Sequence, residues 1–221
     1  MSLNSTMVSL LVTGTLETIY MVFFSTLVGY IIGLPLGFLL VVTKPGGVHP
    51  MPVLNSVLGV ITNILRSIPF IILLLLVRPV TRTLVGTTIG VKAILPPLIV
   101  SAAPYIARVI EGELSEVNAG VIEAARSMGA SDWQIIWKVL LPEAKPSIIL
   151  GIALVLTNVV GYSCMSGFIG GGGLGDIAVR YGYYRYEFVM MVAAVILLII
   201  IVQIIQMLGN RISRKTDKRI R

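Results

Sequence analysis

Long apolar stretches dominate the pattern of hydrophobic and polar positions along this chain. We expect five of them to span a bilayer, near residues 19–42, 53–77, 93–110, 147–169 and 188–208. A spanning helix needs about 20 mostly apolar residues, because the hydrocarbon layer is about 30 Å thick and each helical residue rises about 1.5 Å. The pattern therefore predicts an all-α polytopic membrane protein, organised as a single domain over residues 1–221.

The first span carries glycines at a four-residue spacing, which places them on one helix face: Gly29, Gly33 and Gly37. Such a face favours the close approach of a second backbone. Pro35 lies beside these glycines and offers a simpler alternative, in which the helix is only kinked.

The distribution of basic residues predicts how the chain is oriented in the membrane. With 56% apolar and 12% charged residues, the composition excludes an ordinary water-soluble domain. Six basic residues crowd the last eleven positions, whereas residues 1–43 contain none: Arg211, Arg214, Lys215, Lys218, Arg219 and Arg221. The positive-inside rule then places the C-terminus in the cytoplasm and, with five spans, the N-terminus outside. We interpret this tail as a topology anchor that also meets anionic lipid head groups, and not as a nucleic-acid site.

The long polar segment at about residues 111–145 is cytoplasmic on this topology. Within it, one apolar helical face is predicted, followed by a left-handed stop at Gly129: Val121, Ile122, Ala125 and Met128. Ser131 and Gln134 fit a capping box that starts a second helix. Its predicted apolar face consists of Trp133, Ile136, Trp137 and Leu140, and we expect it to end at Leu141 and Pro142. On periodicity alone, an interfacial lid explains these two helices equally well.

A spaced pattern within this segment is more specific than its periodicity. It reads Glu123, Ala124, Ala125, three residues, Gly129, nine residues, Val139, one residue, Leu141, Pro142. This pattern resembles the EAA loop of ABC importers, which has isoleucine where Val139 stands. The resemblance implies coupling helices that seat on a cytoplasmic ATPase, with the tryptophan and isoleucine face anchored on the permease itself. The implied coupling residues are Glu123, Ala124, Ala125, Gly129, Asp132, Leu141 and Pro142.

Two further sequence runs narrow the resemblance to one family among the ABC importers. NILRSIPFIIL at residues 63–73 and VGYSCMSGFIGGGGLG at residues 160–175 resemble the permeases of the D-/L-methionine ABC importer family. That family implies a type I ABC importer permease fold in the inner membrane and a homodimer that imports methionine. It also implies a cytoplasmic ATPase dimer, which binds ATP and Mg, and an extracytoplasmic substrate-binding lipoprotein. The chain itself is then expected to bind no cofactor and to be no enzyme.

The fourth span contains polar or polarisable residues that are candidates to line a translocation path: Asn158, Tyr162, Ser163 and Met165. Such residues usually face an interior surface in a membrane protein. The resemblance matches Met165 to a methionine in the family's gate, where a flexible thioether closes the path at the dimer axis. Plain helix packing is the alternative for each of them.

Arg66 lies inside the second predicted span, where a charge at the helix centre costs about 2.5–3.5 kcal/mol. It either contacts a substrate carboxylate or has a structural role, pairing with backbone carbonyls freed by Pro69 or lying nearer the membrane interface. Both readings stay open at this stage.

Other function classes have weaker support. Residues 170–175 match G-x-G-x-x-G, but they follow a membrane helix instead of a strand, so we expect a flexible turn or a close-approach region at the outer mouth. The single histidine, His49, is read as a solvated loop residue, and no H-E-x-x-H pair supports catalysis. An importer for another small amino acid or related ligand remains an alternative, as does an ATP-independent channel or membrane sensor.

Overall fold

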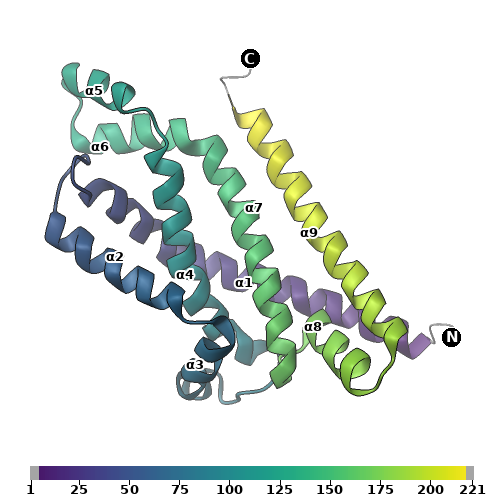
Figure 1. Cartoon of the computed structure of the whole chain (residues 1–221). Helices are drawn as coiled ribbons and strands as arrows, with labels where there is room; N and C mark the ends of the chain where they lie inside the picture. Colours follow the sequence, from purple (N-terminus) through teal and green to yellow (C-terminus); the bar gives the residue numbers. More distant parts are fainter. Residues whose placement is uncertain (1–4, 218–221) are drawn as a thin grey trace.

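In a computed structural model of the chain, which describes residues 5–217, helices are joined by short turns and no strand occurs in that range (Figure 1). The helices are α1 (Ser5–Thr43), α2 (Pro52–Ser67), α3 (Phe70–Val85), α4 (Val91–Ser115), α5 (Ala119–Ser127), α6 (Asp132–Ile135), α7 (Leu141–Met165), α8 (Gly173–Ile177) and α9 (Phe188–Thr216). Wider π-helical turns occupy Ile136–Leu140 and Ala178–Tyr184, and a 3-10 turn occupies Ser166–Ile169. The all-α prediction is confirmed.

The five predicted spans correspond to four long apolar helices and one broken pair. The long helices are α1, α4, the continuous segment Asp132–Ile169 and α9, and each extends beyond the predicted bounds at one end or both. The pair is α2 and α3, whose axes differ by 105°. The span expected over residues 53–77 is therefore not one unbroken helix but a bent pair. Ile68 is extended because it precedes Pro69, and the chain resumes as a helix only at Phe70.

Helix α4 is central and packs against α1, α2, α3 and α7. Its contact with α1 passes through the predicted glycine face, where a Cβ on Gly33 would meet the Ala103 carbonyl and Ile106, and one on Gly37 would meet the Ala107 carbonyl and Ile110. Close backbone packing is thus confirmed. Helix α1 runs on through Pro35 and starts at Ser5, earlier than expected, because residues 5–18 continue the apolar pattern.

The two ends of the bundle differ in what they carry. Helices α5 and α6 lie at the same end as the C-terminal end of α9, whereas α3 and α8 lie at the opposite end (Figure 1). The polar segment and the described basic residues Arg211, Arg214 and Lys215 therefore share one side. Lys218, Arg219 and Arg221 lie outside the described residues.

The glycine contact between α1 and α4 yields a stability prediction. Gly33→Ala places a Cβ 2.5 Å from the Ala103 carbonyl oxygen, so the helices must separate. Overpacking of this kind costs about 1–3 kcal/mol, and we expect a lower melting temperature for the detergent-solubilised chain. Gly161→Ala is the matched control, because a Cβ on this glycine of α7 meets nothing within 4 Å. Equal melting temperatures for the two variants would contradict the packing role.

Candidate functional site

The polar segment between α4 and α7 folds into a sharp corner. Residues 111–115 belong to α4 and residues 141–145 to α7, so the connection is shorter than the predicted 111–145. The Asn118 side chain caps α5 by accepting a hydrogen bond of 2.8 Å from the Gly120 amide. At the far end, Gly129 has a φ of 81°, and its amide donates to the Arg126 carbonyl. The left-handed stop predicted at Gly129 is confirmed.

The second helix begins with the predicted capping box. The backbone amide of Gln134 donates to the Ser131 hydroxyl at 3.4 Å, and the backbone amide of Ser131 donates to the side-chain oxygen of Gln134 at 3.0 Å. These two bonds satisfy backbone amides that the first helical turn leaves free. They fix the direction in which the chain leaves the Gly129 corner.

The second helix does not end at Leu141 and Pro142, contrary to the prediction. It widens into a π-helical turn, in which the Leu141 amide donates to the carbonyl of Ile136, and then continues as α7. Pro142 has no amide hydrogen and its ring clashes with the carbonyl of Lys138 in a regular helix, and the wider turn accommodates it. Asp132–Ile169 therefore forms one continuous helical segment of 38 residues.

The π-helical turn also shifts which side chains face the bundle. Ile135 and Leu140 are fully buried, whereas Trp133 and Trp137 are 68% and 51% exposed. The expectation that the tryptophan face anchors the corner on the bundle is therefore wrong. Met128, predicted on the apolar face of α5, is 81% exposed. The corner thus presents two tryptophans and a methionine outward, residue types that are enriched at protein interfaces.

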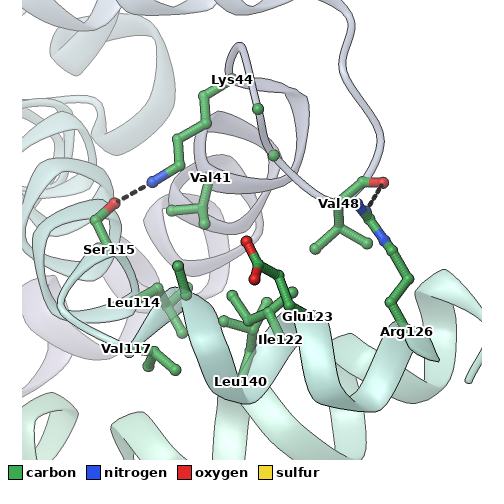
Figure 2. A pocket seen from close by; sticks show the side chains of 13 residues that line it. Val41, Lys44, Val48, Leu114, Ser115, Val117, Ile122, Glu123, Arg126 and Leu140 are labelled. Carbon is green, nitrogen blue, oxygen red and sulfur yellow. Dashed lines mark hydrogen bonds between the residues drawn. The ribbon is translucent and has the colours of Figure 1, made fainter. Parts of the chain in front are cut away.

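A segment that sequence reasoning treated as a simple loop is bound to this corner (Figure 2). We call residues 44–50, between α1 and α2, the strap. Lys44 Nζ donates to Ser115 Oγ at 3.0 Å, and Arg126 donates to the Val48 carbonyl at 2.9 Å, as the dashed lines show. The strap is therefore fixed to the end of α4 and to α5.

A third contact joins the strap to the start of α6. His49 Nδ1 lies 3.3 Å from Asp132 Oδ2, although both side chains are exposed. His49 is therefore the exposed loop residue that was expected, with this one additional contact. No pattern in the sequence signals this pair, because the two residues lie 83 positions apart.

Glu123 lines a cavity of about 210 Å³ between the strap and α5. Its carboxylate points toward the cavity, which Lys44 and Arg126 also line (Figure 2). Of the two alanines beside it, Ala125 is buried against the bundle and Ala124 is exposed. Within residues 5–217, no His, Cys, Asp or Glu side chains are grouped so that they could hold a metal ion.

The predicted path residues lie toward the other end of the same helical segment. The ring of Tyr162 stacks on that of Phe70, with centroids 4.8 Å apart, and Asn158 is partly buried one turn earlier. Ser163 is buried, and its hydroxyl donates to the Val160 carbonyl at 2.8 Å. Met165, the last residue of α7, is 46% exposed.

Arg66 occupies the last turn of α2, directly before the bend, and not the middle of a straight span. Its guanidinium lies 5.7 Å from the centroid of the Tyr105 ring, a cation–π contact to α4. The structure shows this contact and no hydrogen bond from Arg66 to the carbonyls near Pro69 among residues 5–217.

Arg108 is a polar residue that the sequence analysis did not single out. It lies in α4 and donates to the Gly59 carbonyl and to Asn63 Oδ1 of α2, at 2.9 Å each. It also forms an ion pair of 2.6 Å with Glu111. The three-residue spacing of Arg108 and Glu111 was the available signal. These bonds hold α2 against α4.

The glycine run at residues 170–175, which follows the α7 segment, contacts another helix of the same chain. Gly170, Gly172 and Gly173 have positive φ angles of 74°, 79° and 75°. The Gly173 amide donates to Glu17 Oε2 at 2.7 Å, so the turn is bonded to α1. The run is therefore a turn that ends the α7 segment and is bonded to α1, and a close approach of its backbone to substrate or to a binding protein stays a prediction.

Comparison with known proteins places the chain in a family. The model of the family described as binding-protein-dependent transport system inner membrane component matches residues 29–221. The chain belongs to this family. Its membership supports a multi-pass inner-membrane permease subunit, and it confirms the predicted resemblance to ABC importer permeases.

Two relatives illustrate the similarity within this family. The probable D-methionine transport system permease protein MetI of Vibrio cholerae is 48% identical over 218 residues, covering 99% of this chain and 96% of that protein. The D-methionine transport system permease protein MetI of Escherichia coli (strain K12) is 49% identical over 165 residues, covering 75% of this chain and 76% of that protein.

Two solved structures agree with the fold. A chain of the MetNI methionine ABC transporter, described in inward facing conformations, has a TM-score of 0.94 and 47% identity, and covers 97% of this chain and 100% of that one. An amino acid ABC transporter with histidines shares the fold at a TM-score of 0.79 and 20% identity, with 94% of each chain covered. The predicted ABC importer permease fold is confirmed.

The Gly129 corner yields the first functional prediction. Gly129→Ala forces a side chain into a left-handed conformation, at about 1–2 kcal/mol, and we expect it to lower substrate uptake severalfold while membrane insertion stays normal. Gly112→Ala is the matched control, because Gly112 is helical and both glycines leave open space for a Cβ. Uptake by vesicles is the measurement. Equal uptake by the two variants would remove the corner from the mechanism.

The strap yields a second prediction. Arg126→Gln shortens the side chain that reaches the Val48 carbonyl, and His49→Ala removes the contact with Asp132. We expect a transporter assembled with the double variant to use more ATP per substrate molecule imported, because the corner then moves without the strap. The ratio of ATP hydrolysed to substrate imported is measured in reconstituted vesicles. Arg82→Gln, on α3 at the other end of the bundle, serves as control, and an unchanged ratio in the double variant would contradict a role in coupling.

Proposed function

We propose that this chain is the membrane permease subunit of an ATP-driven importer of methionine, acting as a homodimer with a cytoplasmic ATPase dimer. The observation that carries the proposal is the continuous helical segment that joins the Gly129 corner to α7. The substrate is inferred from the relatives of 48% and 49% identity, which are named as D-methionine transport permeases.

The corner has the shape and surface that a partner ATPase requires. Met128, Trp133 and Trp137 are exposed there and provide apolar contact area. Behind them, Ile135 and Leu140 are fully buried, so the corner cannot slide over the bundle without moving it. Closure of the ATPase around ATP is thereby converted into movement of α7.

The helical segment carries that movement to the opposite end of the bundle. Asp132 and Met165 are separated by about 50 Å of helix length, with a bend where α6 passes into α7 (Figure 1). We place the gate at Met165, whose exposed thioether can meet its counterpart in the second copy. Tyr162, Asn158 and Arg66 are assigned to the path beside it. Because the Ser163 hydroxyl is buried and bonded within its own helix, we assign Ser163 to packing.

The proposed orientation places the corner and the C-terminus in the cytoplasm and the N-terminus outside. The shared location of the corner and of Arg211, Arg214 and Lys215 supports this orientation, since basic residues favour the cytoplasmic side. ATP and Mg then bind the partner ATPase, and an extracytoplasmic binding lipoprotein delivers the substrate. The permease itself remains non-catalytic.

Reconstitution tests this proposal. Proteoliposomes that contain the permease, its ATPase and the binding protein are expected to take up labelled methionine only when ATP is supplied. A panel of other amino acids establishes the substrate, and an ATPase variant that binds but does not hydrolyse ATP is the control. Uptake or conductance without ATP would indicate a channel, and preferential uptake of a different amino acid would refute the assignment to methionine.

A further inference from the structure

The last part of α9 has a polar face turned away from the bundle. One shallow groove on this face is lined by Met207 and by six polar or charged residues, Gln203, Gln206, Asn210, Arg211, Arg214 and Lys215. The opposite face packs on α7, where Gly209 contacts Ala153 and Ser213 donates to the Pro146 carbonyl. We call the lined surface the α9 polar face.

The side chains of the α9 polar face are exposed and have no partner among residues 5–217. None of the hydrogen bonds or ion pairs in that range involves Arg211, Arg214 or Lys215. Helical geometry places Gln206 about 7 Å and Gln203 about 12 Å along the axis from Arg211, toward the middle of the span. An amide that lies at that depth without a hydrogen-bond partner is costly in a bilayer.

Along α9, the charged, amide and apolar side chains of this face follow one another in the order of the phosphate, ester and acyl groups of a phospholipid. In a phospholipid bound along this face, the phosphate would meet the cations of Arg211 and Arg214, and the ester carbonyls would accept hydrogen bonds from the amides of Gln206 and Asn210. Farther along the helix, Ile200, Ile204 and Met207 are exposed and apolar, as acyl chains require. We propose that the α9 polar face is a binding site for an anionic phospholipid.

Charge favours a lipid over a second copy of the chain. In a symmetric contact between two α9 helices, Arg211 and Arg214 would face the same residues of the partner, and like charges at an interface are unfavourable. An anionic head group neutralises these cations instead. The leaflet concerned, the cytoplasmic one, rests on the proposed orientation, whereas the binding itself does not.

Lipid binding is measured by native mass spectrometry on the full-length chain, titrated in detergent with phosphatidylglycerol or phosphatidylcholine. We expect phosphatidylglycerol to bind at least about tenfold more tightly, and Arg211→Gln/Arg214→Gln to lose at least about tenfold in that affinity. Gln206→Leu/Asn210→Leu is expected to weaken binding severalfold without any change in charge. Arg78→Gln/Arg82→Gln removes the same charge from α3 and is expected to leave the affinity unchanged.

Each alternative outcome overturns the site. Equal affinity for the two lipids, or an equal loss in the α3 variant, would show diffuse attraction only. An unchanged affinity in Gln206→Leu/Asn210→Leu would show that the amides form no part of a site, and loss of the dimer in Arg211→Gln/Arg214→Gln would show an interface between copies. Because no ATPase, nucleotide or substrate is present, failure here is distinct from failure of the transport proposal.

Discussion

The hydrogen bond from the Leu141 amide to the Ile136 carbonyl is the interaction on which the rest of the architecture depends. It closes a wide helical turn at the point where Pro142 would otherwise break the helix. The corner at Gly129 and the exposed methionine at the end of α7 therefore belong to one rigid element. Without that turn they would be separate pieces, and movement at the corner would not reach the far side of the bundle.

The remaining contacts keep this element aligned. Helix α4 supports it from the centre, and close packing at Gly33 and Gly37 fixes α1 on α4. Arg108 binds α2 to α4 by hydrogen bonds that stay strong in a medium of low polarity. The strap then joins the α1–α2 connection to the corner. A load on the corner is thereby shared between α7 and the α1–α2 pair.

Sequence reasoning identified the features that have local causes. Apolar length predicted the spans, and the positions of Gly129, Ser131 and Gln134 predicted the corner and its cap. The 105° bend was missed because apolar residues continue on both sides of Pro69 and hide the break. The outward tryptophans were missed because a periodicity of 3.6 residues assumes a regular α-helix. The strap was missed because its contacts join residues far apart in sequence.

The central claim is that Trp133 and Met165 move as parts of one rigid helix. The most direct measurement is the distance between spin labels on Trp133→Cys and Met165→Cys, in a Cys164→Ser background, with labelled chains diluted by unlabelled ones in the complete transporter. The account predicts a narrow distribution that is the same with and without ATP, at a distance shorter than the ~48 Å of a straight helix because the segment bends where α6 passes into α7 (Figure 1). A broad distribution, or a distance that changes with nucleotide, would reveal a hinge between the corner and α7 and would contradict the account.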